Sequence, residues 1–133
     1  MGQGLIMAES LLLDTDVLID FLCDYTKATN FVNANASRII LPSIVVAELY
    51  AGVKGESELK VLDNFISLFR VLPVTSEISK TGGLYKRDYG KSHDVGLADA
   101  IIAASCEAEN AELKTLNVKH YPMIKGLKPT YEK

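Results

Sequence analysis

The stretch that decides the fold is LLLDTDVLID, from Leu11 to Asp20. Three leucines in a row, without a charge among them, are typical of a short strand that is buried on both faces. Two aspartates, Asp14 and Asp16, follow this strand directly, before the apolar pattern resumes. Because an unpaired carboxylate is costly to remove from water, acids at this place need a partner or a chemical purpose.

Short apolar segments and amphipathic segments alternate along the rest of the chain. Strands are expected over residues 11–13, 38–41, 70–74, 111–116 and, at an edge, 127–131, and helices over residues 17–23, 27–35, 43–51, 56–69, 76–89 and 95–109. Ser43 and Ser76 are the expected N-caps of their helices. The alternation predicts an α/β fold with a parallel sheet of four or five strands that is covered on both faces. In such sheets the functional site lies beyond the carboxyl ends of the strands, where Asp14 and Asp16 stand.

The length of 133 residues indicates one domain, which we expect to cover residues 11–133. Residues 1–10 form an N-terminal extension that lacks the pattern of a signal peptide and is a candidate for disorder. No apolar run approaches the roughly 18 to 20 residues of a membrane span. The two cysteines, Cys23 and Cys106, belong to no disulfide or zinc pattern, which favours a reducing, cytoplasmic setting.

The formal net charge of −3 provides no overall attraction to a polyanion. Binding of a nucleic acid would therefore require a local basic patch, or cations that reverse the local sign. Lys86, Arg87 and Lys91, which lie beside two tyrosines, are the candidate patch, although a solvated helix face is the simpler interpretation for each of them. The two histidines, His93 and His120, lie in polar surroundings and are expected to be structural or exposed.

Two further acids interrupt apolar helical segments. Glu48 and Asp99 each have only apolar or small residues three and four positions away on either side, which predicts an acid on a core face. No lysine or arginine lies within one helical turn of these two acids or of Asp14. If the fold brings the three together, a divalent cation is the natural means to relieve their repulsion. Oxygen ligands without His or Cys favour Mg²⁺ or Mn²⁺ over zinc.

Each of these acids also has a structural interpretation. Asp16, or Asp14, is a suitable N-cap for the helix that follows. Glu48 would be unremarkable if it pointed along a helix edge into solvent. Asp99 would be ordinary if it stood at the start of its helix, with Asp94 as the solvated alternative. The metal hypothesis rests on the coincidence that three separate apolar segments each carry one acid.

Four segments together resemble a known family. LLLDTDVLIDFL, LPSIVVAELYAG, HDVGLADAIIAA and LKTLNVKHYP are similar, in order and spacing, to the four motifs of PIN-domain proteins, in particular the VapC-type toxins of toxin–antitoxin pairs. The resemblance covers the chain from Leu11 to Lys128. It implies a three-layer α/β/α fold and a Mg²⁺- or Mn²⁺-dependent endoribonuclease. It also implies a homodimer and a VapB-like antitoxin that inhibits the enzyme through an arginine in the acidic pocket.

The resemblance assigns roles to individual positions. The metal-binding and catalytic acids fall on Asp14, Glu48 and Asp99, and the supporting polar positions fall on Asp16, Thr115 and Asn117. Asn117 stands where the family has a fourth acid, and its amide brings no charge, which puts a second metal ion in doubt. Lys86, Arg87 and Lys91 would contact the RNA backbone.

Two other functions remain open at this level. Asn117 favours a PIN fold that works as a binding or regulatory module without catalysis. The segment DTDVL also resembles the start of haloacid-dehalogenase-type phosphatases, with Asp14 as nucleophile and Asp16 as acid. That family requires an acid at the end of a later strand, and the fourth expected strand ends in TLNV.

Overall fold

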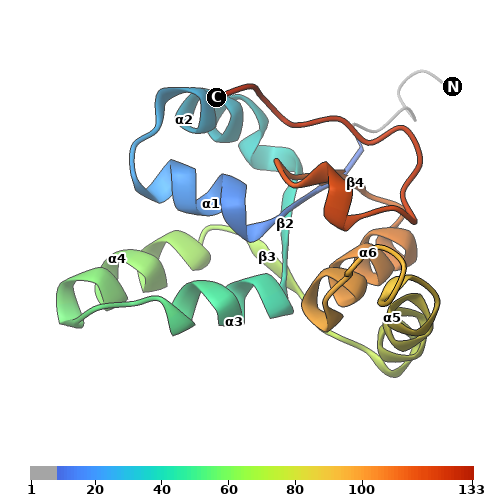
Figure 1. The fold of residues 1–133 in the computed structure, drawn as a ribbon. Coiled ribbons are helices and arrows are strands. Elements are labelled where there is room, and N and C mark those ends of the chain that lie inside the picture. Colours follow the sequence, from blue (N-terminus) through green and yellow to red (C-terminus); the bar gives the residue numbers. More distant parts are fainter. Residues whose placement is uncertain (1–8) are drawn as a thin grey trace, which may run out of the picture.

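A four-stranded parallel sheet, in the order β3-β2-β1-β4, forms the centre of the structure, a computed structural model that describes residues 9–133 (Figure 1). The strands are β1 (Leu11–Leu13), β2 (Ile39–Pro42), β3 (Arg70–Leu72) and β4 (Glu112–Lys114). In the central register, Leu12 pairs with Ile40 on one side and with Leu113 on the other. The expected extension of residues 1–10 lies outside the described residues except for its last two positions.

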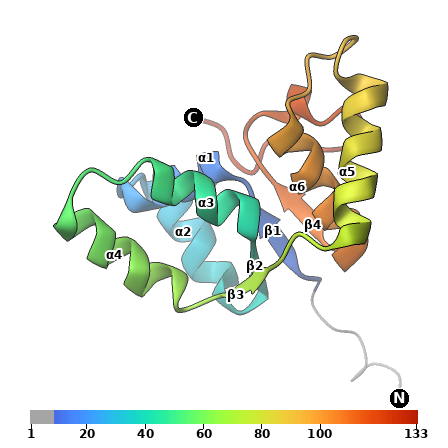
Figure 2. The ribbon, with the colours of Figure 1, turned by 90° about the horizontal axis from the view of Figure 1, so that it is seen from below.

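Within residues 9–133, six α-helices cover this sheet on both faces. They are α1 (Thr15–Leu22), α2 (Thr26–Asn35), α3 (Ser43–Ala51), α4 (Glu56–Ile66), α5 (Ser76–Tyr89) and α6 (Leu97–Glu109), with short 3₁₀ turns η2 (Ala36–Arg38) and η3 (Val118–His120). The steps from β1 to β2 to β3 run in one direction across the sheet, so right-handed connections place α1 to α4 on one face. The step back from β3 to β4 places α5 and α6 on the other face (Figures 1 and 2). The predicted three-layer α/β/α fold is confirmed.

The strand β1 lies at the centre of the core. Leu11, Leu12 and Leu13 are exposed by 1%, 0% and 0%, so both faces of the strand are covered, as the run of leucines predicts. Of the helix predicted over residues 56–69, α4 covers Glu56–Ile66, and its Leu62 and Phe65 are buried in the core.

Gly82 allows α5 to pack closely against α6. A Cβ atom added at Gly82 of α5 would stand 3.0 Å from Cγ1 of Ile101, so this glycine is required by the contact between the two helices. Cys106 of α6 is buried, and burial raises the pKa of its thiol to about 12. Because this thiol stays protonated at neutral pH, it behaves as an apolar core residue.

Three local predictions are wrong. Residues 127–131 form no strand. Thr130 donates both its N–H and its hydroxyl to the carbonyl of Thr115, at 3.0 and 3.1 Å, in place of a regular series of hydrogen bonds with a neighbouring strand. Ser43 and Ser76 are the first residues of their helices and do not cap them. Thr75 is the cap of α5, and its hydroxyl accepts a hydrogen bond from the N–H of Ile78 at 3.1 Å.

In residues 9–133, no helix has both the length and the apolar character that crossing a membrane requires.

Candidate metal centre

Asp14 is fixed by both the strand before it and the helix after it. Its N–H donates to the carbonyl of Lys114 at 2.9 Å, which extends the pairing of β1 with β4 by one step. Its Oδ1 accepts a hydrogen bond from the N–H of Thr15 at 2.7 Å, so Asp14 is the N-cap of α1. The chain leaves β1 towards β2 on one side and returns as β4 on the other, and this switch point is where parallel sheets hold their sites.

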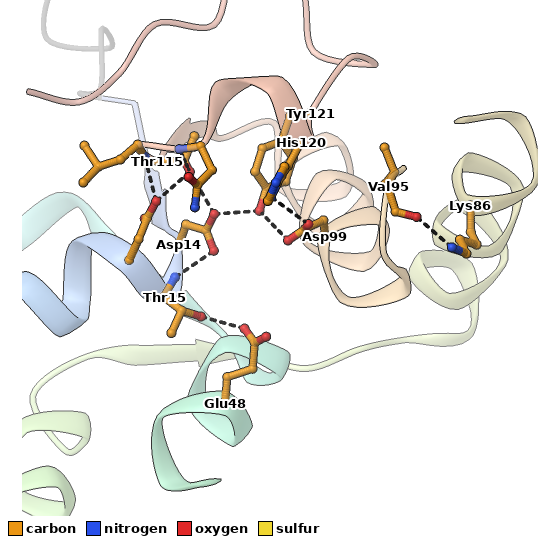
Figure 3. Close-up of polar contacts among 12 residues, drawn as sticks. Asp14, Thr15, Glu48, Lys86, Val95, Asp99, Thr115, His120 and Tyr121 are labelled. Carbon is orange, nitrogen blue, oxygen red and sulfur yellow. Dashed lines mark hydrogen bonds and ion pairs between the residues drawn. The ribbon is translucent and has the colours of Figure 1, made fainter. Parts of the chain in front are cut away.

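Asp14 is 6% exposed, and its carboxylate accepts three hydrogen bonds. Its Oδ2 accepts from the hydroxyl of Thr115 at 2.8 Å and from the hydroxyl of Tyr121 at 2.7 Å (Figure 3). A carboxylate offers about four acceptor positions, two on each oxygen. Both positions on Oδ2 are therefore occupied, and one remains open on Oδ1.

The hydroxyl of Tyr121 lies between Asp14 and Asp99 (Figure 3). It stands 3.2 Å from Oδ1 of Asp99, compared with 2.7 Å from Asp14. Burial, followed by the two carboxylates, raises the pKa of Tyr121, so the hydroxyl keeps its proton. Because it has only one proton to donate, the shorter contact with Asp14 is the hydrogen bond, and Asp99 meets the same oxygen more loosely.

Asp99 lies in the first turn of α6 and is half-buried. Its Oδ2 is 3.3 Å from Nδ1 of His120, which is the second polar contact of this carboxylate. Burial is the main cause that raises the pKa of Asp99, and the negative charge of Asp14 adds to it, against the opposing effect of His120. The start-of-helix interpretation of Asp99 is thus correct, and Asp94 is exposed in the preceding loop.

Glu48 does not lie on a core face, so that prediction is wrong. The helix α3 is apolar on nearly all sides, and for this reason apolar neighbours do not identify its buried side: Val45 and Leu49 point to the core, while Glu48 is exposed. Its Oε1 accepts a hydrogen bond from the hydroxyl of Thr15 at 2.6 Å (Figure 3). Thr15 therefore links the two acids: its hydroxyl donates to Glu48 and its N–H donates to Asp14.

Asp16 is half-buried, in the first turn of α1, and is not the N-cap. Its Oδ2 accepts from the N–H of Leu116 at 2.9 Å and lies 3.3 Å from the hydroxyl of Thr115. Its carboxylate thereby connects α1 to the segment after β4. Burial, and then the charge of Asp14, raise the pKa of Asp16 in spite of these hydrogen bonds.

Thr115 is fully buried and connects the acids to the segment after β4. Its hydroxyl donates to Asp14, at the distance given above, and accepts from the N–H of Asn117 at 3.1 Å. The side chain of Asn117 is exposed and forms no hydrogen bond with the acids in the described part of the chain. The side chain of Thr115 therefore contacts Asp14 directly, whereas Asn117 contributes only its backbone N–H, which donates to Thr115.

We expect Thr115→Val to lower the free energy of unfolding by about 2 kcal/mol, because the change leaves a buried acceptor and a backbone donor without their partner. Urea unfolding at pH 7 without divalent ions measures this loss. Thr26→Val, at an exposed position on α2, is the control and should be close to neutral. Equal unfolding midpoints for the two variants would contradict the connecting role of Thr115.

The predicted basic patch lies at the end of α5 and contacts none of the acids by a hydrogen bond. The Nζ of Lys86 donates to the carbonyl of Val95 at 2.8 Å, which attaches α5 to the loop before α6 (Figure 3). Arg87 pairs with Asp88 at 2.8 Å, and Lys91 is exposed. Contact of these residues with RNA stays a prediction.

The sequence interpretation missed three residues of the site: Thr15, His120 and Tyr121. All three follow β1 or β4 within a few positions, and these two strands are neighbours in the sheet. Their position after two neighbouring parallel strands is the signal that could have identified them. Polar side chains after adjacent parallel strands meet at one edge, whatever their residue type.

The donor set fits a hard divalent cation, although no three Asp, Glu, His or Cys side chains within residues 9–133 form a preformed metal cluster. Asp14 has an open acceptor position, and both Asp14 and Asp99 contact the hydroxyl of Tyr121. Two carboxylates therefore lie close together in a largely buried place. No salt bridge between described residues neutralises Asp14. Oxygen donors under mutual repulsion are typical ligands of Mg²⁺ and Mn²⁺.

Fold and site together define a class: a three-layer α/β/α protein with a pair of carboxylates, Asp14 and Asp99, at the switch point of a parallel sheet. The family model described as PIN domain matches residues 11–121. The chain belongs to the PIN domain family.

Named relatives and solved structures agree with this family. The chain is 36% identical over 124 residues to ribonuclease VapC10 of Mycobacterium tuberculosis, covering 91% of this chain and 92% of that protein. It is 37% identical over 125 residues to ribonuclease VapC19 of the same organism, covering 90% and 98%.

Among solved structures, a toxin–antitoxin complex from Klebsiella pneumoniae gives a TM-score of 0.81 at 25% identity, over 93% of this chain and 100% of that one. A DNA-bound VapBC from Salmonella typhimurium gives 0.77 at 25% identity, over 92% and 97%.

Proposed function

We propose that this protein is a divalent-metal-dependent endoribonuclease and the toxin of a VapBC-type toxin–antitoxin pair. The ribonucleases VapC10 and VapC19 are matched over 92% and 98% of their own length, so the comparison with these two concerns the whole domain. The observation that carries the proposal is the pair of carboxylates, Asp14 and Asp99, that meets at one buried hydroxyl beyond the ends of β1 and β4.

Asp14 and Asp99 are the residues proposed to hold the cation, which we take to be Mg²⁺ or Mn²⁺, and Glu48 is the third acid, which is linked to Asp14 through Thr15. When bound in such a site, a divalent cation lowers the pKa of a water molecule and neutralises charge on the phosphate. Thr115 and Thr15 keep Asp14 in one orientation through hydrogen bonds to its two oxygens. Asp16 and Asn117 are proposed to support this arrangement from the neighbouring turns.

The proposed path of the RNA backbone follows the basic residues at the end of α5. Phosphate contacts fix the position of a nucleic acid without reading its sequence, and lysine and arginine provide them. Lys86 is engaged with the carbonyl of Val95, and Arg87 is paired with Asp88, so both would have to exchange a partner. Lys91 is exposed and forms no salt bridge with a described residue, which makes it the readiest of the three.

The proposed protein partner is a VapB-like antitoxin. The solved structures that resemble this chain include a toxin–antitoxin complex and a VapBC complex. Beside Glu48, the helices α1, α3 and α4 form a groove of about 510 Å³ that is mainly apolar, with Ile19, Leu49, Val53 and Val61 among its lining residues. An antitoxin segment that covers this groove would bring a basic side chain to the acids, where a charge pair is favourable. The expected homodimer stays a prediction.

Cleavage of RNA by the purified protein tests the proposed function. We expect single-stranded RNA to be cut in the presence of Mg²⁺ or Mn²⁺ and to remain intact with EDTA, with cleavage restored when either cation is added in excess. Gel analysis of end-labelled RNA over time gives the rate. RNA that stays intact under all these conditions would favour the binding or regulatory module instead.

The phosphatase alternative has no support in the structure. Its second acid is required at the end of a later strand, but β4 is followed by Thr115, Leu116 and Asn117, and the chain belongs to the PIN domain family.

A further inference from the structure

The ring of Tyr121 belongs to the core, but its hydroxyl has no role there. The residue is 1% exposed and is part of the hydrophobic cluster around β1. A phenylalanine would fill the same space. A buried tyrosine hydroxyl needs a polar partner, and the partners of this one are Asp14 and Asp99.

These two carboxylates come from different layers of the molecule. Asp14 follows β1, whereas Asp99 belongs to α6, and among residues 9–133 Tyr121 is the residue whose hydroxyl contacts both: it donates to Asp14 and lies 3.2 Å from Asp99 (Figure 3). Glu48 is connected only through Thr15. The separation of Asp14 and Asp99 therefore depends on one hydroxyl, in addition to the packing of the backbone.

The hydrogen bond from Tyr121 does not compete with a cation for Asp14. It occupies Oδ2 together with Thr115, whereas the open acceptor position is on Oδ1. A cation that binds Oδ1 can leave the tyrosine in place. Asp99 has one contact on each oxygen, at 3.2 and 3.3 Å, so it keeps open acceptor positions for the same cation without losing its contact with Tyr121.

We infer that Tyr121 is a positioning residue of the metal centre, whose hydroxyl holds the Asp14 and Asp99 carboxylates at a fixed separation so that a divalent cation meets a prearranged pair. This inference rests on the proposed function, because it assumes that these two acids bind the cation. Outer partners of metal ligands typically contribute 10- to 100-fold to metal affinity. Since Thr115 also orients Asp14, we expect an effect near the lower end of that range.

Binding of Mn²⁺ to metal-free protein, measured by isothermal titration calorimetry, tests the inference. Tyr121→Phe is expected to raise the Kd for Mn²⁺ by about tenfold relative to the unchanged protein. Tyr85→Phe is the matched control, because it also removes a hydroxyl bound to a carboxylate, that of Glu107, between α5 and α6. The control should bind Mn²⁺ as the unchanged protein does.

A second readout separates positioning from general damage. In RNA cleavage, Tyr121→Phe should need about ten times more Mn²⁺ for half of its maximal rate, and the rate at saturating Mn²⁺ and the KM for RNA should stay near those of the unchanged protein. Equal Kd values for Tyr121→Phe and the unchanged protein would overturn the inference and leave the proposed function intact. Failure of the unchanged protein to bind Mn²⁺ at all would instead refute the proposed metal site.

If Tyr121→Phe does not fold, the unchanged protein answers the same question by NMR. The buried hydroxyl proton of Tyr121 should exchange slowly, and its resonance should move when Mg²⁺ is added while remaining hydrogen-bonded. A resonance that does not respond to Mg²⁺, in a protein that calorimetry shows to bind the ion, would overturn the inference.

Discussion

Asp14→Asn is expected to lower the rate of RNA cleavage by at least about 100-fold. Replacement of a residue that only hydrogen-bonds to a metal ligand typically lowers activity by about 10- to 100-fold, and we expect the replacement of a ligand itself to cost at least as much. The amide keeps the shape of the carboxylate but removes the charge from the most buried acid of the site. It also forces an NH₂ group towards one of the donors that now face Asp14, namely the N–H of Thr15 and the hydroxyls of Thr115 and Tyr121. Initial rates on labelled RNA at saturating Mg²⁺ measure the loss.

The control for this experiment is Asp63→Asn. Asp63 is an exposed acid of α4 that accepts a hydrogen bond from Tyr50 at 2.6 Å, away from the ends of β1 and β4. Its replacement should leave cleavage unchanged, and circular dichroism should show that both variants are folded. Equal cleavage by Asp14→Asn and the unchanged protein would mean that the activity comes from a contaminant or from another site.

Asp99→Asn is expected to have two opposite effects: cleavage falls by at least about 100-fold, while the metal-free protein becomes more stable. The gain in stability follows from the raised pKa of Asp99, which shows that burial and the charge of Asp14 disfavour the ionised form in the folded protein. An asparagine carries no such charge. The melting temperature in EDTA at pH 7 should therefore be higher for the variant than for the unchanged protein.

The same shift fixes the sign of the pH dependence. A carboxyl whose pKa is higher in the folded than in the unfolded state binds more protons when folded, at pH values between the two. The contributions of Asp99 and Asp16 to stability therefore fall as the pH rises from the ordinary aspartate value of 3.8 through their raised values. Asp99→Asn should weaken this decline in EDTA. A variant that melts lower than the unchanged protein at pH 7 would contradict this account.

The fold could be predicted from the sequence because its signals are local. The run of leucines before Asp14 is hydrophobic enough to define β1, and the alternation of strand and helix patterns defines a parallel sheet. The ends of the elements were less predictable. Ser43 and Ser76 have the chemistry of caps, but the residues before them already occupy the cap positions.

The candidate site was predictable only in part, because its connections are distant in sequence. Thr115 and Tyr121 lie 101 and 107 positions from Asp14, and no local pattern shows that their hydroxyls share one carboxylate oxygen. Glu48 was assigned to a core face because an all-apolar helix does not reveal its buried side. In the structure Glu48 is exposed, and it accepts a hydrogen bond from Thr15.

The order of the site residues along the chain has a consequence for synthesis. A ribosome makes Asp14 with the first strand, but it makes Thr115 and Tyr121 only after α6, in the last fifth of the sequence. A nascent or prematurely terminated chain that lacks β4 therefore carries the acid without the hydroxyls that orient it. Such fragments should leave the RNA of their own cell uncut, and the nuclease becomes competent only after β4 and the segment that carries Tyr121 have been made.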